Sequence, residues 1–294
     1  MFLQLLANGL VTGSVIAIAA VGVSIVYGIL RLVNFAYGDF MAFGALAAYA
    51  FNGPLGIELV AATLLAMVAT AALSVGLDVV LWRPLRVQRA GFMSFFLASI
   101  GLALVLRQAL LLAYGPQSQT YRVDPYKVYV LGSVRLSEAQ VVTILTACAV
   151  IVALGLFLAR TTLGRTMRAL ADDSALAAIA GIDVGRVIAL TWILSGLLAA
   201  VAGVLAGLVQ TTFDPNFGFQ LLLPIFAAVV LGGIGSAYGA LAGGLLLGIA
   251  MELSTWSSLF GGVDPVYKPV VAFVVLAGAL MVRPQGLFGR ARVV

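Results

Sequence analysis

Two charged side chains stand inside long apolar stretches of the chain, where a charge is costly and usually functional. Asp39 lies in NFAYGDF (34–40), and Arg107 lies in LVLRQALLL (104–112). The Asp39 carboxylate can pair with an ammonium group, or it can cap a broken helix or join a structural ion pair. Arg107 can snorkel to the membrane surface, form a structural pair or contact a substrate. The candidate substrate pathway therefore starts from Asn34, Tyr37, Asp39 and Arg107.

A second segment, FDPNFGF (213–219), is similar in composition to the first. Each is a short break with aromatic residues, glycine and a carboxylate, and each follows a Gly- and Ala-rich apolar segment. We add Asp214 and Asn216 of this break to the candidate pathway. With the topology derived below, the two breaks lie on opposite sides of the membrane, as expected of inverted repeats. The alternative is that the breaks are unrelated, since such segments are common in membrane proteins.

The rest of the chain lacks the groups that catalysis or metal binding requires. It has no histidine, one cysteine (Cys148) and 11 acidic residues. Histidine-based triads, histidine metal sites, CxxC centres and an internal disulfide are therefore excluded. Both lysines, Lys127 and Lys268, follow tyrosine, so the chain has no GxxxxGK[ST] loop for ATP. We predict no enzymatic activity, no metal and no cofactor.

The composition places most of the chain in lipid. Of its 294 residues, 63% are hydrophobic and 9% are charged, and the mean hydropathy is +1.16. An average soluble domain carries roughly 25% charged residues. The apolar segments are 5–27, 35–51, 57–81, 92–112, 138–159, 187–209, 220–234, 237–254 and 267–282. They predict an all-α membrane helix bundle of about nine spans (8–10), since one span takes about 20 residues. The short segments 35–51 and 220–234 suggest broken or re-entrant helices.

Basic residues divide unevenly between the two sets of loops. The richer set is Arg31, Arg83, Arg86, Arg89, Arg160, Arg165, Arg168, Arg186, Arg283, Arg290 and Arg292. Because cytoplasmic loops carry the excess of Lys and Arg, this side is predicted to be cytoplasmic. The N-terminus is then outside and the C-terminus inside. Orientation in the lipid bilayer accounts for the net charge of +5, and we expect no nucleic-acid partner.

The loop 160–186, RTTLGRTMRALADDSALAAIAGIDVGR, differs in kind from the others. Its Ala-rich centre favours a helix. Asp172, Asp173 and Ser174 offer a helix start, and Gly181 offers a helix end. The loop therefore predicts a short amphiphilic cytoplasmic helix that presents a rigid surface to a partner.

Small residues recur at a spacing of four in the second half of the chain. One series is Ala199, Gly203 and Gly207, and another is Gly235, Gly239 and Gly243. This spacing places them on one helix face, where neighbouring backbones approach closely. It predicts tight helix packing.

Taken in order, these segments resemble the permease subunits of bacterial branched-chain amino acid ABC importers, the LivH type. The resemblance is carried by YGILRLVNFAYGDFMAFGALAAY (27–49), GRTMRALADDSALAAIAGIDVGRVIALTWILSGLLAAVAGVLAG (164–207) and AAVVLGGIGSAYGALAGGLLLGI (227–249), with RPQGLFG at 283–289. It implies a single transmembrane permease domain (1–294) in the bacterial inner membrane. The implied partners are two cytoplasmic ATP-binding subunits, a second homologous permease chain and an extracytoplasmic substrate-binding protein.

The resemblance also gives the loop 160–186 a function. In ABC importers a short cytoplasmic helix docks into a groove of the ATPase, often with an Ala-x-x-x-Gly element, which fits Ala177 to Gly181. Arg165, Arg168, Asp172 and Asp173 would then be polar contacts at that joint. The alternative is a solvated linker helix.

One position departs from the family pattern. Family members often have NFAHGE or NFAHGD, whereas this chain has Tyr37 in place of the histidine. If that position contacts the pathway, the cargo can differ from leucine, isoleucine and valine; related permeases move urea, short amides or other amino acids. A competing interpretation is an ATP-independent secondary transporter or channel, which explains the spans but not the cytoplasmic helix.

Overall fold

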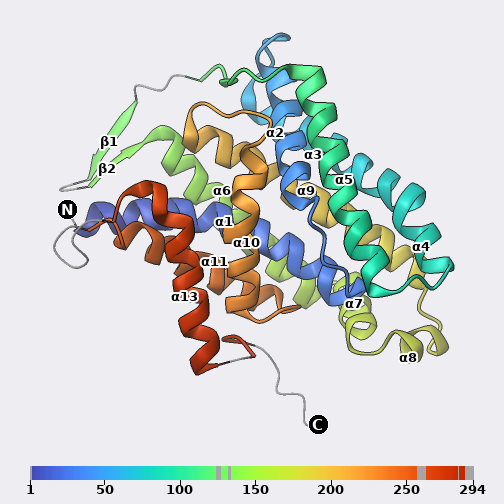
Figure 1. Cartoon of the computed structure of the whole chain (residues 1–294). Helices are drawn as coiled ribbons and strands as arrows, with labels where there is room; N and C mark the ends of the chain where they lie inside the picture. The colour runs from blue at the N-terminus through green and yellow to red at the C-terminus, as the bar shows by residue number, and fades with distance from the viewer. Residues whose placement is uncertain (1, 124–126, 132–133, 257–262, 284, 289–294) are drawn as a thin grey trace.

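The computed structural model describes residues 2–123, 127–131, 134–256, 263–283 and 285–288, and it is a bundle of helices with one small hairpin (Figure 1). The apolar helices are α1 (Phe2–Leu30), α2 (Tyr37–Asn52), α3 (Leu59–Leu77), α5 (Phe92–Tyr114), α6 (Glu138–Arg160), α9 (Val184–Gln210), α10 (Phe217–Gly232), α11 (Ala237–Leu253) and α13 (Lys268–Val282). The connections contain η1 (Asp78–Trp82), α4 (Arg83–Val87), β1 (Val128–Leu131), β2 (Val134–Ser137), α7 (Thr162–Asp172), α8 (Ser174–Ile179) and η2 (Pro265–Tyr267). Arg290, Arg292 and parts of the RPQGLFG segment lie outside the described residues.

Every apolar segment predicted from the sequence contains a helix, because a backbone in lipid must satisfy its own hydrogen bonds. In the described part of the chain, six helical stretches are long and apolar enough to cross a membrane. They are α1, residues 59–87, α5, α6, α9 and residues 265–282. The helices α2 and α10 have 16 residues each and α11 has 17, which is shorter than a full span. The structure thus shows a membrane helix bundle, and the count of nine crossings stays a prediction that depends on these three helices.

The all-α expectation misses the hairpin of β1 and β2, which pair antiparallel in the loop before α6. The Gln4 side chain fixes this hairpin to the start of α1. Its Nε2 donates to the carbonyl oxygen of Arg135 at 2.8 Å, and its Oε1 accepts from the Arg135 backbone N–H at 2.7 Å.

Among the six membrane-length stretches, α1 and α9 are the most deeply buried, and they form the centre of the bundle. Their buried residues run without interruption from Gly13 to Val26 and from Leu198 to Leu208. Small residues let neighbouring helices approach α1 closely. Gly248 of α11 lies against Gly13, and Gly244 lies against Ala17, so α11 runs antiparallel to α1. In α5, α6 and α13, by contrast, most side chains face outward.

The predicted glycine series mostly takes part in this packing. Gly203 lies against α2, and both Gly239 and Gly243 lie against α10. Gly207 lies against the rings of Phe213, before α10, and Tyr121, after α5. Gly235 needs a correction, because it precedes α11 in a turn at φ +87° and so is not a step of the helix ladder. It packs on α1 through that turn.

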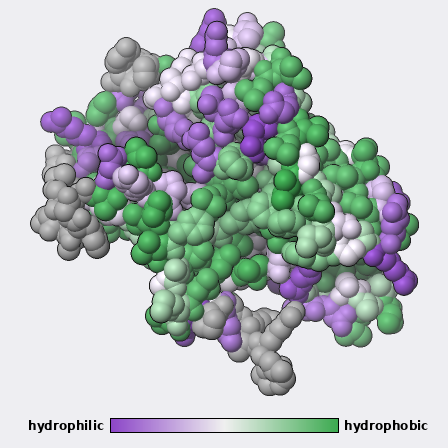
Figure 2. Space-filling view, viewed as in Figure 1, coloured by the Kyte–Doolittle hydropathy of each residue, from purple (hydrophilic) through white to green (hydrophobic). Residues whose placement is uncertain are grey.

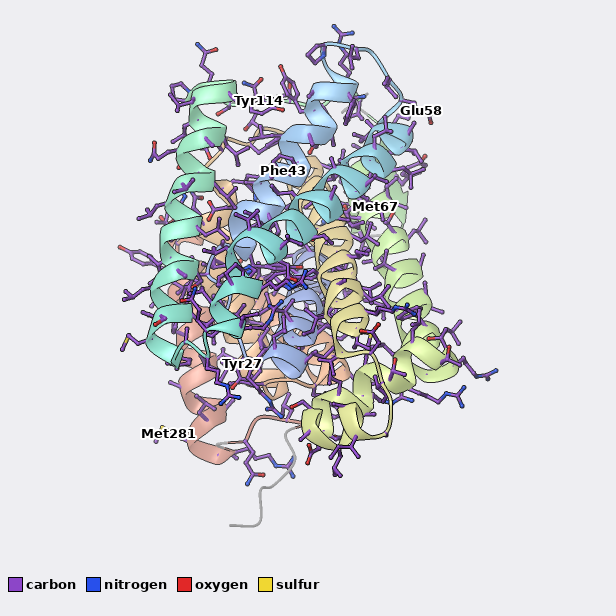
Figure 3. The ribbon with its side chains drawn as sticks, turned by 90° about the vertical axis from the view of Figure 1, so that its right-hand side faces the viewer. Tyr27, Phe43, Glu58, Met67, Tyr114 and Met281 are labelled. Carbon is purple, nitrogen blue, oxygen red and sulfur yellow. The ribbon has the colours of Figure 1, made fainter. Side chains whose placement is uncertain are left out.

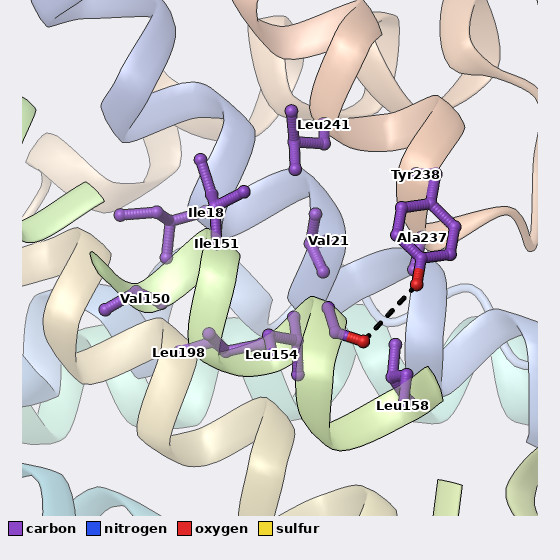
Figure 4. A pocket seen from close by; sticks show the side chains of 11 residues that line it. Ile18, Val21, Val150, Ile151, Leu154, Leu158, Leu198, Ala237, Tyr238 and Leu241 are labelled. Carbon is purple, nitrogen blue, oxygen red and sulfur yellow. Dashed lines mark hydrogen bonds between the residues drawn. The ribbon is translucent and has the colours of Figure 1, made fainter. Parts of the chain in front are cut away.

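The α6 helix attaches to the centre at an apolar contact with α1, α9 and α11 (Figure 4). A cavity of about 60 Å³ remains there between aliphatic side chains. The Tyr238 hydroxyl donates to the Gly155 carbonyl oxygen at 3.4 Å at its edge. The aliphatic lining explains how α6 is held without a charged contact at this cavity.

Two short non-helical segments interrupt the bundle. The first break (31–36) joins α1 to α2, and the second break (211–216) joins α9 to α10. Arg31 Nη2 donates to the Ala171 carbonyl oxygen of α7 at 3.2 Å, so the first break lies beside α7. The second break pairs with Gln119 in the loop after α5. Figures 1 and 3 show α7 and α8 at the lower end of the bundle, which we call the α7 end, and the loop after α5 at the opposite end.

The two breaks share one local structure. Arg31 and Thr211, which directly follow α1 and α9, have φ values of 52° and 61°. The Oδ1 atoms of Asn34 and Asp214 then accept a backbone N–H two residues further on, at 3.1 and 3.0 Å. Such Asx turns redirect the chain before a new helix begins. The second break therefore repeats the first, at the other end of the bundle.

Candidate functional site

An ion pair joins α2 to α5 inside the bundle. Arg107 Nε lies 3.1 Å from Asp39 Oδ1, and Arg107 Nη2 lies 3.4 Å from Asp39 Oδ2. The Asp39 side chain is 1% exposed and the Arg107 side chain is 13% exposed. The guanidinium carbon also lies 4.0 Å from the centroid of the Phe219 ring in α10. Three helices therefore meet at a two-pronged contact between full charges.

The local structure explains why a charge is tolerated there. Asp39 is in the first turn of α2, where the helix dipole favours a carboxylate. The N-cap position is Ala36, which makes no side-chain cap. The pairing decides between the structural alternatives that the sequence left open. Arg107 forms an ion pair with Asp39 and does not snorkel to the surface.

A contact between two glycines positions this site. Gly38 in the first turn of α2 and Gly218 in the first turn of α10 approach so closely that a Cβ on either would overlap the carbonyl oxygen of the other. Asp39 follows Gly38, and Phe219 follows Gly218. The matched starts of α2 and α10 therefore place the carboxylate and the ring on either side of one backbone contact.

The site reaches the surface on one side. Phe219 is about half exposed, and the adjacent polar residues Gln108 and Gln220 are exposed. Figure 2 shows hydrophilic residues over the upper ends of α2, α5 and α10. We call Arg107, Gln108, Phe219 and Gln220 the α5–α10 face. Polar groups on apolar helices are costly against lipid, so this face suits a water-filled path or a protein partner.

The other predicted pathway residues lie elsewhere. Asn34 and Tyr37 are buried in the first break and at the start of α2, and the Tyr37 hydroxyl lies against Gly22 of α1. Asp214 and Asn216 form the Asx turn of the second break. Of the six predicted residues, the structure therefore places only Asp39 and Arg107 in the ion-pair site. The others shape the two breaks.

An aromatic cluster adjoins the ion pair on the side of the α7 end. Phe35 of the first break lies 5.3 Å from Phe96 of α5 and 5.1 Å from Phe226 of α10, between ring centroids. Each ring belongs to a helix, or the start of one, that also supplies a residue of the Asp39 site. On each element the ring lies nearer the α7 end than the residue of the Asp39 site does. Phe35 is about one turn from Asp39, Phe226 about two turns from Phe219, and Phe96 about three turns from Arg107.

The loop 160–186 folds into two helices, α7 and α8, where one was predicted. Asp173 separates them, because its Oδ1 caps α8 by accepting the N–H groups of Ala175 and Leu176 at 2.8 and 3.0 Å. Gly181 follows α8 at φ +83°. Both end signals are therefore confirmed. Ala177, however, is buried against the protein, and the outward apolar side chains of α8 are Leu176 and Ile179.

The four predicted polar contacts of this loop, Arg165, Arg168, Asp172 and Asp173, are all exposed. Arg168 donates to the Leu158 carbonyl oxygen at the end of α6, so it holds α7 to its own chain. The buried side of α7 carries the small and apolar residues that fit against the bundle, and its exposed side carries the arginines. The α7 helix is therefore amphipathic, whereas the amphiphilic helix predicted between Asp172 and Gly181 corresponds to α8.

Comparison with known proteins identifies the family. The model of the branched-chain amino acid transport system permease component matches residues 5–282. The chain belongs to this permease family. It is 35% identical to the high-affinity branched-chain amino acid transport system permease protein BraD of Pseudomonas aeruginosa, over 99% of this chain and 97% of the relative. It is 34% identical to LivH of Escherichia coli over the same shares, and 34% identical to the ribose import permease RbsC of E. coli over 42% of this chain and 39% of that protein.

Membership confirms the resemblance seen in the sequence. The chain is a transport permease subunit of an ABC importer, not an enzyme, and it is a multi-pass protein of the inner membrane. Permeases of this family work with ATP-binding and substrate-binding partners.

Several residues around the Asp39–Arg107 pair were not predicted from the sequence. Phe219, Gly38, Gly218 and the aromatic cluster were present in the two break motifs or in the apolar segments but were assigned no role. The usable signal was the matched Gly–Asp–Phe and Gly–Phe ends of the two motifs, which place a glycine at the same point of each half-helix. No comparable signal marked Phe96, because phenylalanine is common in membrane helices.

Proposed function

We propose that this permease conducts branched-chain or other neutral amino acids along the α5–α10 face, with the Asp39–Arg107 pair as the point of cargo contact. The observation that carries the proposal is a buried, two-pronged ion pair that reaches the surface beside an exposed aromatic ring. The names of the BraD and LivH relatives support the cargo class. Urea or a short amide is the alternative cargo, and it would use the same groups as hydrogen-bond partners.

A zwitterion suits this pair chemically. Its carboxylate can replace Asp39 beside the Arg107 guanidinium, and its ammonium group can pair with Asp39. Each charge then remains paired, so the exchange avoids leaving an isolated charge in a low-dielectric site. The half-exposed Phe219 ring offers an apolar surface to an aliphatic side chain. An amino acid can therefore separate Asp39 from Arg107 without a large electrostatic cost.

The exposed polar residues of the α5–α10 face favour the presence of a second permease chain. Gln108 and Gln220 are exposed on helices that otherwise suit lipid. A homologous chain opposite this face would cover the polar residues and complete the path. The whole chain, 1–294, would act as one transmembrane domain, with the loop 160–186 as its coupling element.

Coupling to the ATP-binding subunits would run from α8 to Asp39. Ile179 of α8 is 84% exposed, an unusual position for an isoleucine outside the spans, and it suits a groove on an ATPase. From α7, the bond between Ala171 and Arg31 reaches the first break, and the first break leads directly into α2. A displacement of α8 and α7 would thus move the start of α2, which carries Asp39.

The distribution of basic residues supports the orientation. Arg83, Arg86, Arg165 and Arg168 belong to elements on the side of the richer basic set, together with α7. The α7 end would then be cytoplasmic, where two ATP-binding subunits dock, and the substrate-binding protein would deliver cargo at the opposite end. The N-terminus would be outside and the C-terminus inside.

The test is uptake of radiolabelled L-leucine by the complete importer in proteoliposomes. Arg107→Gln is expected to reduce uptake at least tenfold, because the carboxylate loses its partner. Lys127→Gln is the control, since Lys127 pairs with Glu138 at the surface and lies outside the coupling loop 160–186. Uptake by Arg107→Gln at the control rate would refute the cargo contact. ATP-independent uptake by the chain alone would instead identify a secondary transporter or channel.

A further inference from the structure

A cavity of about 300 Å³ lies at the α7 end, apart from the Asp39 site. Its walls are residues 30–33 of the α1 end and first break, together with Ala90, Phe92, Phe95 and Phe96 at the start of α5. This volume is at the lower end of the range for small-molecule sites, about 300–1,000 Å³. It suits an amino acid better than a whole phospholipid.

The lining combines one charge with an apolar wall. Among the lining residues that the structure describes, Arg31 is the charged one, and the others are aliphatic or aromatic. One N–H of Arg31 donates to the Ala171 carbonyl oxygen. A guanidinium has five N–H donors in a fork that matches a carboxylate, so Arg31 can bind a carboxylate while it keeps that bond.

The backbone also singles out Arg31. Its φ of 52° lies in the left-handed region, which L-residues other than Gly, Asn and Asp rarely adopt. Backbone strain of this kind persists only where the surrounding structure holds it, and it gathers at functional sites. Arg89, which precedes the cavity residue Ala90, has the same φ of 52°. Strained arginines thus border the cavity on both of its walls.

The cavity lies in line with the Asp39 site. Phe96 is both a wall of the cavity and a member of the aromatic cluster with Phe35 and Phe226. Along α5, Phe96 is three turns before Arg107, or about 16 Å at 1.5 Å per residue. The order from the opposite end to the α7 end is therefore the Asp39–Arg107 pair, the aromatic cluster and the Arg31 cavity.

We propose that the Arg31 cavity is a second cargo station, which receives an amino acid after it has passed the aromatic cluster. The carboxylate pairs with Arg31, and the aliphatic side chain lies against Val33, Phe92 and Phe95. This inference rests on the proposed function, because it assumes that the permease carries a carboxylate. It adds a site on the α7 side at which cargo is held before release, and it assigns Arg31 a role in recognition.

Protection from thiol labelling tests the station in the complete importer. Val33→Cys is introduced into a Cys148→Ser background, and its reaction with a small water-soluble methanethiosulfonate is timed with and without L-leucine. The reaction is expected to slow about tenfold at a leucine concentration about ten times its Kd, because only the empty fraction reacts. Val87→Cys is the control, since Val87 is exposed on α4 and is not among the described lining residues.

Two further arms examine the chemistry of recognition. Leucinamide, which lacks the carboxylate, is expected to give no protection. Arg31→Gln is expected to abolish protection by leucine, and Arg31→Lys is expected to retain part of it. If Arg31 served only to hold α7 through Ala171, leucine would still protect Val33→Cys in the Arg31→Gln variant. Equal protection by leucine and leucinamide would overturn the role of Arg31.

The outcomes separate this inference from the proposed function. Leucine uptake without protection of Val33→Cys refutes the station and leaves the proposed function intact. Failure of the unmodified importer to take up leucine or any other neutral amino acid under ATP refutes both. If protection of Val33→Cys depends on the phosphatidylglycerol content of the vesicles and not on leucine, the cavity binds an anionic lipid. That result would overturn the proposed cargo station.

Discussion

Replacing Arg107 with glutamine removes the cationic half of the buried ion pair and leaves the Asp39 carboxylate without its partner. Asp39 is 1% exposed and Arg107 is 13% exposed, so water screens the pair little. Breaking a buried pair from one side costs about 3–5 kcal/mol, because an uncompensated charge remains. Asp39→Asn should cost less, roughly 1–3 kcal/mol, because Arg107 keeps some exposure and the Phe219 ring.

The double variant Asp39→Asn/Arg107→Gln has no buried charge at this site. Its loss of stability should therefore be smaller than the sum of the two single losses, by about 2 kcal/mol or more. The assay is unfolding in mixed micelles with increasing SDS, followed by far-ultraviolet circular dichroism. All variants are purified in the same mild detergent, so that only the side chains differ.

Arg186→Gln provides the control, because the Arg186 and Asp183 side chains are 85% and 55% exposed. Its effect should stay below about 1 kcal/mol, as for other surface pairs. Losses that add within about 0.5 kcal/mol in the double variant would show that Asp39 and Arg107 act independently. That result would contradict both the pairing and the exchange mechanism built on it.

Three other predictions follow from the packing. Gly218→Leu should destabilise the chain by about 1–3 kcal/mol or more in the same assay, because its side chain overlaps α2, whereas Gly101→Leu should be tolerated because a Cβ there meets nothing within 4 Å. The aromatic cluster lies between the Asp39 site and the Arg31 cavity, so Phe96→Ala should weaken a barrier there and raise leakage of leucine from proteoliposomes that contain the importer without ATP. Leakage equal to that of the unmodified importer would show that the cluster is not a barrier. Tyr121→Phe should cost about 1 kcal/mol, since the hydroxyl donates to the Ala45 carbonyl oxygen at 3.1 Å. Burial raises the pKa of Tyr121 well above 10.0, so this stabilisation should be complete at neutral pH and be lost only when the pH rises above about 10. A difference in stability between the two chains that disappears between pH 6 and 8 would contradict this reasoning.

The sequence alone determined the features that depend on neighbouring residues. Apolar runs dictated helices, because lipid leaves the backbone no other partner. Asx residues and glycine marked where helices stop and restart. Asp173 and Gly181 bound α8 as expected, and the two segments of similar composition both interrupt the helices; that they share an Asx turn, at Asn34 and Asp214, is seen only in the structure.

The tertiary structure alone decided which distant groups meet. Asp39 and Arg107 are 68 residues apart, and each had several possible partners when only the sequence was considered. Their contact depends on Gly38 and Gly218, which bring the starts of two half-helices together. The burial of Ala177 likewise depends on how α8 rests on the bundle. Local hydrogen bonds and hydropathy are properties of a short stretch of chain, whereas partner choice across a bundle depends on the packing of several helices at once.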